Sequence, residues 1–145
     1  KGFVQAIQDK YKLPVVSLCG SRRIVPQTRY SVLDAGPKEF LRLFADASVI
    51  CTDSFHGTVF SINFMKEFYC FKSATKAEMA VNSRLYNILD RLGLLPRMFS
   101  HTMEYREFRS LIGQDAAAIN YSQTHDILQE ERDKSIRYLR DSLQL

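Results

Sequence analysis

A histidine stands where two apolar stretches of different character meet, in the run TDSFHGT at residues 52–58. The apolar residues 49–51 before this run are β-branched or small, which is typical of a strand. Residues 59–65 after it are apolar at a density that favours a buried helix. This order predicts a strand, a short turn and a helix, with His56 close to the start of the helix.

The residues around His56 have the chemistry of a small anion site. Asp53 or Ser54 can cap the helix through a side-chain oxygen, while the N–H groups and dipole of its first turn favour a negative charge. Gly57 lets a ligand approach the backbone, and an imidazole with an unperturbed pKa of about 6.5 suits proton donation. A second interpretation fits equally well: Ser54 is only a cap, and His56 is a helix-terminal histidine bonded to a nearby carbonyl.

The composition is that of one domain with a sizeable core, since 46% of the 145 residues are hydrophobic and 25% are charged. The net charge of +4 is spread along the chain, which favours anionic ligands without indicating nucleic acid. Three cysteines without a CxxC spacing argue against a disulfide framework and against a zinc site. We therefore expect buried thiols in a reducing compartment at Cys19, Cys51 and Cys70. No stretch approaches the ~20 apolar residues that a membrane span needs.

Helices alternate with short apolar strands along the chain. The predicted helices are 3–11, a helix beginning at Pro37, 59–65, 85–92, 103–112 and 122–143. The predicted strands are 15–19, 48–52 and 68–71, and residues 20–29 form a loop or a weak strand. This alternation predicts an α/β fold, a Rossmann-like parallel sheet with helices on both faces. Ligands of such sheets bind beyond the carboxyl ends of the strands, which is where His56 falls.

Local signals give the expected limits and buried faces of two helices. Gly36 precedes Pro37, which suits a first helical position, and the buried stripe of that helix is Phe40, Leu41 and Phe44. The helix over 85–92 has Asn82 or Ser83 as its predicted N-cap and Gly93 as its C-terminal stop.

Two further expectations concern burial. Strand 48–52 is apolar enough to be covered on both faces, as strands of parallel sheets are. The last helix carries an apolar stripe, and its charges are a solvated face or a brace against another domain rather than a nucleic-acid surface. The residues of that stripe are Leu128, Ile136, Leu139 and Leu143.

Three segments together resemble the C-terminal part of the polysaccharide pyruvyl transferase family. They are residues 36–71, residues 82–97 and residues 119–143, and they follow one another in the family's order over nearly the whole chain. The resemblance implies a GT-B-like architecture, in which two Rossmann-like halves face each other across a cleft. Residues 1–145 would then be a single domain, most of the C-terminal half, and the N-terminal half would be absent.

The activity implied by the resemblance is the transfer of the enolpyruvyl carbons of phosphoenolpyruvate to two sugar hydroxyls, which leaves a cyclic ketal and inorganic phosphate. The expected partners are phosphoenolpyruvate and a glycan acceptor of cell-surface polysaccharide, exopolysaccharide or cell-wall synthesis, including lipid-linked acceptors. This places the protein in the cytoplasm, or peripherally at the inner face of the membrane. No cofactor and no metal ion is expected.

The resemblance also assigns roles to residues. His56 is the catalytic acid, because protonation of the enol ether requires a positioned proton donor. Arg84 is the first choice for the cation that binds the carboxylate or phosphate of the donor. The expected substrate-binding residues are Asp53, Ser54, Gly57, Thr58, Asn82, Ser83, Arg84 and Arg22.

One position departs from the better-understood branch of the family, which has an arginine two residues before the histidine. This chain has Ser54 there, and a serine donates only one neutral hydrogen bond. The anion is then held by Arg84, Arg22 and Arg23, or the donor is different. Two alternatives therefore stay open: a GT-B-like glycosyltransferase with a nucleotide-sugar donor, and a non-catalytic module that binds anions or glycans.

Overall fold

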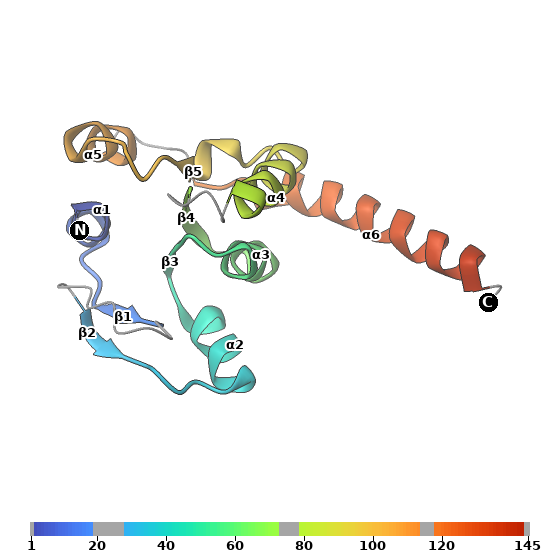
Figure 1. Cartoon of the computed structure of the whole chain (residues 1–145), viewed down its shortest axis with the longest axis horizontal. Coiled ribbons are helices and arrows are strands. Elements are labelled where there is room, and N and C mark those ends of the chain that lie inside the picture. The colour runs from blue at the N-terminus through green and yellow to red at the C-terminus, as the bar shows by residue number, and fades with distance from the viewer. Residues whose placement is uncertain (1, 19–27, 73–78, 114–117, 144–145) are drawn as a thin grey trace.

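The computed structural model describes residues 2–18, 28–72, 79–113 and 118–143, with six α-helices and five short strands in that part of the chain (Figure 1). Their order is α1 Gly2–Tyr11, β1 Val15–Ser17, β2 Thr28–Ser31, α2 Pro37–Asp46, β3 Val49–Thr52, α3 Phe55–Asn63, β4 Glu67–Phe71, α4 Met79–Arg91, the 3₁₀-helix η2 Leu95–Arg97, β5 Met98–Phe99, α5 Tyr105–Gly113 and α6 Tyr121–Leu143. The predicted alternation of helices and strands is confirmed.

The strands pair in parallel, as predicted, but they form two sheets instead of one. β1 pairs with β2, and β3, β4 and β5 form a second sheet in that order, with Ile50 opposite Phe68 and Phe71 opposite Phe99. Part of the predicted loop is a strand, since β2 covers Thr28–Ser31. β1 has three residues and β2 has four, so the ladder between them is short. In the described part of the chain, neither strand is hydrogen-bonded to β3, which is why there are two sheets.

Helices cover both faces of the three-stranded sheet, and β4 shows why. Its residues alternate between the two faces, as in any strand. Phe68 and Cys70 pack in one apolar cluster with side chains of α3 and α4, whereas Tyr69 and Phe71 pack in an aromatic cluster with α1 and α5. All four side chains are buried, so β4 is the central strand of the core.

The prediction that strand 48–52 is covered on both faces is wrong at one position. β3 buries Ile50 but leaves Cys51 exposed, because β3 is the edge strand of its sheet. Of the three cysteines that we expected to be buried, Cys70 is buried, Cys51 is not, and Cys19 lies outside the described residues.

The predicted helix limits hold at some ends and fail at others. α2 begins at Pro37 after an extended Gly36, and its Phe44 is buried, but Leu41 is exposed and lies outside the apolar cluster that Phe40 and Phe44 join. α4 begins at Met79, so the predicted N-cap at Asn82 or Ser83 is wrong and both residues lie within the helix.

Gly93 follows the end of α4 with a φ of +68°, in the left-handed region that favours glycine. It therefore confirms the predicted C-terminal stop.

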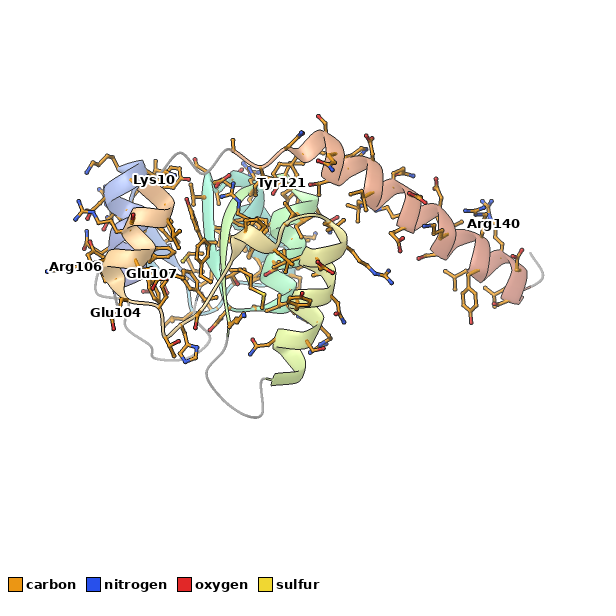
Figure 2. The ribbon with its side chains drawn as sticks, turned by 90° about the horizontal axis from the view of Figure 1, so that it is seen from above. Lys10, Glu104, Arg106, Glu107, Tyr121 and Arg140 are labelled. Carbon is orange, nitrogen blue, oxygen red and sulfur yellow. The ribbon has the colours of Figure 1, made fainter. Side chains whose placement is uncertain are left out.

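α6 extends away from the rest of the molecule, as Figures 1 and 2 show. Its first half is tied down by Arg132, which donates to Asn63 Oδ1 at 2.8 Å, and by an ion pair of Glu131 with Arg91 at 3.0 Å. In the stripe that we expected on one side, Leu128 is half-buried, whereas Ile136, Leu139 and Leu143 are exposed. Among the described residues, no helix is both long and apolar enough to cross a membrane.

Candidate functional site

The predicted strand, turn and helix around His56 are present. β3 ends at Thr52 and α3 begins at Phe55, with Ser54 as an extended N-cap. The Ser54 Oγ accepts the Gly57 N–H at 3.4 Å, and the Thr52 Oγ1 accepts the Ser54 N–H at 3.1 Å. His56 is therefore the second residue of α3. It is exposed at the carboxyl end of a parallel strand, the edge at which ligands of such sheets bind.

Gly57 has a structural reason to be glycine. A Cβ at this position would lie 2.3 Å from the Thr52 Oγ1, so the side chain of Thr52 occupies the space over the first turn of α3. Gly57 itself is buried. The backbone approach that we expected from a ligand is thus made by Thr52, and Gly57 acts by letting the end of β3 pack against the start of α3.

Thr58 also belongs to the interior of this turn. Its side chain is fully buried, with the hydroxyl 3.1 Å from the Ser54 carbonyl oxygen and 3.4 Å from the Cys70 Sγ. Burial raises the pKa of the Cys70 thiol, the Thr58 hydroxyl opposes that rise, and the Asp53 carboxylate adds to it. Cys70 is therefore a neutral core residue and not a nucleophile.

α4 brings Arg84 to the motif. The Arg84 guanidinium carbon lies 5.2 Å from the centre of the Phe55 ring, within the range of a cation–π contact. The same ring lies 6.0 Å from the His56 imidazole, centre to centre, with the two planes at 81°. The exposed Arg84 therefore lies beside the first turn of α3.

The other predicted site residues are distributed unequally. Asp53 and Ser54 are exposed in the turn itself, next to His56. Ser83 is exposed and Asn82 is half-buried, both within α4 close to Arg84. Arg22, with Arg23, lies outside the described residues. Within the described ranges, no group of three or more His, Cys, Asp or Glu side chains could hold a metal ion.

Sequence reasoning missed Phe55. It reads as one more apolar residue of a helix, yet its ring contacts both Arg84 and His56. The available signal was its place directly before the histidine, because an aromatic ring beside an expected cation site can hold an arginine.

Sequence reasoning also missed the ion pair of Arg97 with Glu67 at the other edge of the sheet. Arg97 is only 6% exposed. No sequence pattern marks such a pair, since its two members come from η2 and β4.

A pocket of about 210 Å³ lies at the opposite end of α3 from His56. α3 and the start of α6 line it, with Tyr121, His125 and Arg132 among the residues at its wall. It includes none of the predicted site residues. Its polar groups serve packing: the Arg132 guanidinium bonds Asn63, and the Tyr121 hydroxyl donates to the Lys66 carbonyl oxygen.

The segment that carries β3, α3 and the histidine turn was compared with known protein families. Residues 7–74 match the family model of the polysaccharide pyruvyl transferases. The match confirms the resemblance over this segment, which includes His56 and Phe55 and ends before Arg84. Comparison with curated proteins and with solved structures found no match. Within the segment that matches this family model, the exposed histidine stands in the first turn of a helix at the carboxyl end of a strand.

Proposed function

We propose that this chain is the donor-binding part of a transferase that pyruvylates a sugar of a cell-surface polysaccharide precursor, with phosphoenolpyruvate as donor. One observation carries the proposal: within the family-matched segment, His56 is exposed in the first turn of α3, and Arg84 lies against the neighbouring Phe55. A proton donor and a cation beside a helix N-terminus suit a small, anionic donor.

The chemistry assigns one step to His56. Its imidazolium protonates the methylene carbon of the donor, and the adjacent carbon becomes oxocarbenium-like. A first sugar hydroxyl adds to that carbon and returns a proton to His56. A second hydroxyl then forms the other carbon–oxygen bond as the carbon–oxygen bond to phosphate breaks, and its proton leaves with the phosphate. The products are a cyclic ketal that carries the pyruvyl carboxylate, and inorganic phosphate.

Arg84 and the first turn of α3 share the negative charge of the donor. A guanidinium binds a carboxylate or a phosphate through two parallel N–H groups, and the N-terminal dipole of α3 adds a favourable field. Four polar residues lie near Arg84 or His56 in the chain, and in this proposal they contact the remaining polar atoms of the substrates. They are Asp53, Ser54, Asn82 and Ser83. Thr58 and Gly57 support the turn from within.

The acceptor needs a second wall. By the family resemblance, we place it against an N-terminal Rossmann-like domain that faces this one across a GT-B-like cleft, in the cytoplasm or at the inner face of the membrane. Positioning two reactants can lower a reaction barrier by, at most, on the order of 7–11 kcal/mol. The 145-residue chain alone should therefore bind the donor without turning it over.

Ser54 favours a donor other than phosphoenolpyruvate, or no donor at all. Because it stands where the better-understood branch has an arginine, the donor site has one cation fewer, which suits a donor other than phosphoenolpyruvate. A nucleotide-sugar donor on the same architecture would make the protein a glycosyltransferase, and a site that binds glycans without turnover would make it a binding module.

The test is a donor screen with the full-length gene product, which follows phosphate release from phosphoenolpyruvate against lipid-linked and nucleotide-linked sugars. His56→Gln keeps a side chain of similar size with a hydrogen bond and removes the acid, so we expect the rate to fall on the order of 10²–10⁴-fold. His101→Gln is the matched control, because His101 is an exposed histidine outside the motif, and it should leave the rate unchanged.

Three outcomes decide between the alternatives. Full activity of the His56→Gln variant would exclude His56 as the acid. Release of a nucleotide diphosphate without phosphoenolpyruvate would establish the glycosyltransferase. Glycan binding with no turnover of either donor would establish the module.

A further inference from the structure

The ring of Phe55 links the two charged groups of the proposed site. Phe55 is half-buried and packs against the apolar cluster of α3 and α4, so the core fixes its position. One part of the ring meets the Arg84 guanidinium at 5.2 Å, and another meets the His56 imidazole edge-on at 6.0 Å.

This contact changes what Arg84 can do. An exposed arginine has many rotamers and loses much of that conformational freedom when a ligand orders it. A guanidinium held over an aromatic face is already partly ordered, and its in-plane N–H groups remain available to an anion. A ring in a fixed place therefore lets Arg84 bind a carboxylate or phosphate at a smaller entropic cost.

We propose that Phe55 is a positioning residue, whose ring holds the Arg84 guanidinium beside the first turn of α3 as the cation that Ser54 does not supply. The inference rests on the proposed function, because it concerns how the same site binds its anionic donor. It specifies the ligand as one that presents a carboxylate or phosphate to Arg84 next to the proton donor His56. A leucine at position 55 would fill the core but lack the face that attracts a cation.

The first experiment measures binding to the 145-residue chain by titration with phosphoenolpyruvate and, separately, with inorganic phosphate. Phe55→Leu should weaken the binding of both anions about two- to fivefold, which is the effect expected of one exposed cation–π contact. Phe55→Tyr keeps the ring face and should bind like the wild type. In an Arg84→Ala background, Phe55→Leu should have no further effect.

Two variants control for changes that do not touch the site. Tyr30→Leu removes the ring of a second cation–π pair, in which the Arg29 guanidinium lies 5.3 Å from the exposed Tyr30. Arg106→Ala removes the same charge as Arg84→Ala from α5, at the far side of the molecule from α6 (Figure 2). Both should bind the two anions as the wild type does.

A second readout separates positioning from a general structural role. The Nε–H proton of Arg84 should carry a ring-current shift in the NMR spectrum that Phe55→Leu abolishes and Phe55→Tyr retains, while the melting temperature of Phe55→Tyr stays that of the wild type. In the active full-length protein, Phe55→Leu should raise the KM for the donor more than it lowers kcat.

The inference and the proposed function fail differently. Equal effects of Phe55→Leu with and without Arg84, or no anion binding by the wild type, would overturn the role of Phe55. Normal coupling of Phe55 and Arg84 in phosphate binding, without turnover of phosphoenolpyruvate by the full-length gene product, would overturn the proposed function alone.

Discussion

Arg84 and Arg97 lie at opposite edges of the three-stranded sheet, Arg84 where the strands end and Arg97 where they begin. The two arginines have different roles. Arg84 is exposed beyond the carboxyl end of β3 and rests on an aromatic ring. Arg97 is buried before the amino end of β5 and pairs with Glu67, the first residue of β4. A buried charge must be paired because its desolvation is costly, whereas an exposed guanidinium keeps donors for a ligand.

The surroundings of the two arginines reinforce the contrast. The edge with Arg97 also carries Tyr121, whose hydroxyl bonds the Lys66 carbonyl, so its polar groups are used in packing. At the edge with Arg84, the polar side chains of Asp53, Ser54 and His56 are all exposed. The comparison teaches that one edge of this sheet maintains the fold, and that the other is available for binding.

The largest expected effect is on stability, and it follows from the loss of the Arg97–Glu67 ion pair. Arg97→Met leaves the half-buried Glu67 carboxylate without its cation, so we expect the free energy of unfolding to fall by about 3 kcal/mol, the lower end for a broken buried pair. Urea unfolding followed by circular dichroism measures it. Arg42→Met is the matched control, because it breaks an ion pair with Asp46 that is exposed to solvent, and it should change the stability little.

The double variant Arg97→Met/Glu67→Leu sharpens this prediction. It removes both charges, so it should be more stable than Arg97→Met alone. Equal stability of the Arg97→Met and Arg42→Met variants would contradict the structural role of the buried pair.

An intermediate effect is expected in the turn that supports the binding edge. Gly57→Ala places a methyl group where the Thr52 Oγ1 lies, and overpacking of this kind costs about 1–3 kcal/mol. Thr52→Ala in the same chain should recover part of the loss. Gly113→Ala is the control, because no atom of the described residues lies within 4 Å of the added Cβ and stability should change by less than about 0.5 kcal/mol. A Gly57→Ala variant as stable as this control would show that Thr52 moves freely.

The smallest effect uses pH to distinguish two packed tyrosines, Tyr69 and Tyr121, from the edge that carries His56. Burial first, and then the hydrogen bond between Tyr69 and Tyr11, raise the pKa of Tyr69. Burial, and then the Glu67 carboxylate, raise the pKa of Tyr121. Below about pH 10 both tyrosines are neutral in the folded and unfolded chains. Above it the unfolded chain binds fewer protons, so stability falls by about 1.4 kcal/mol per pH unit for each tyrosine.

Unfolding at pH 9 to 11 tests this directly. Tyr69→Phe and Tyr121→Phe should each reduce the slope of the free energy of unfolding against pH. His56→Gln, at the edge proposed for binding, should leave this slope unchanged. A stability that is constant through this range would contradict the raised pKa values.

The parts of the molecule that were predictable depend on neighbours in the chain. Pro37 starts α2 and Gly93 follows the end of α4 because the backbone angles that proline and glycine favour are local properties. The turn between β3 and α3 follows from an apolar strand, the cap at Ser54 and an apolar helix. The position of His56 at the carboxyl end of a strand was therefore evident from the order of residues alone.

The features that were not predictable depend on which elements meet. The exposure of Cys51 follows from the place of β3 at the edge of a sheet, and the start of α4 at Met79 overrides the capping signals at Asn82 and Ser83. The Phe55–Arg84 contact joins residues of α3 and α4, and the Arg97–Glu67 pair joins η2 and β4. Local backbone preference sets where α2 and the turn before α3 begin, but desolvation and packing between distant segments set which charges are buried and which remain exposed.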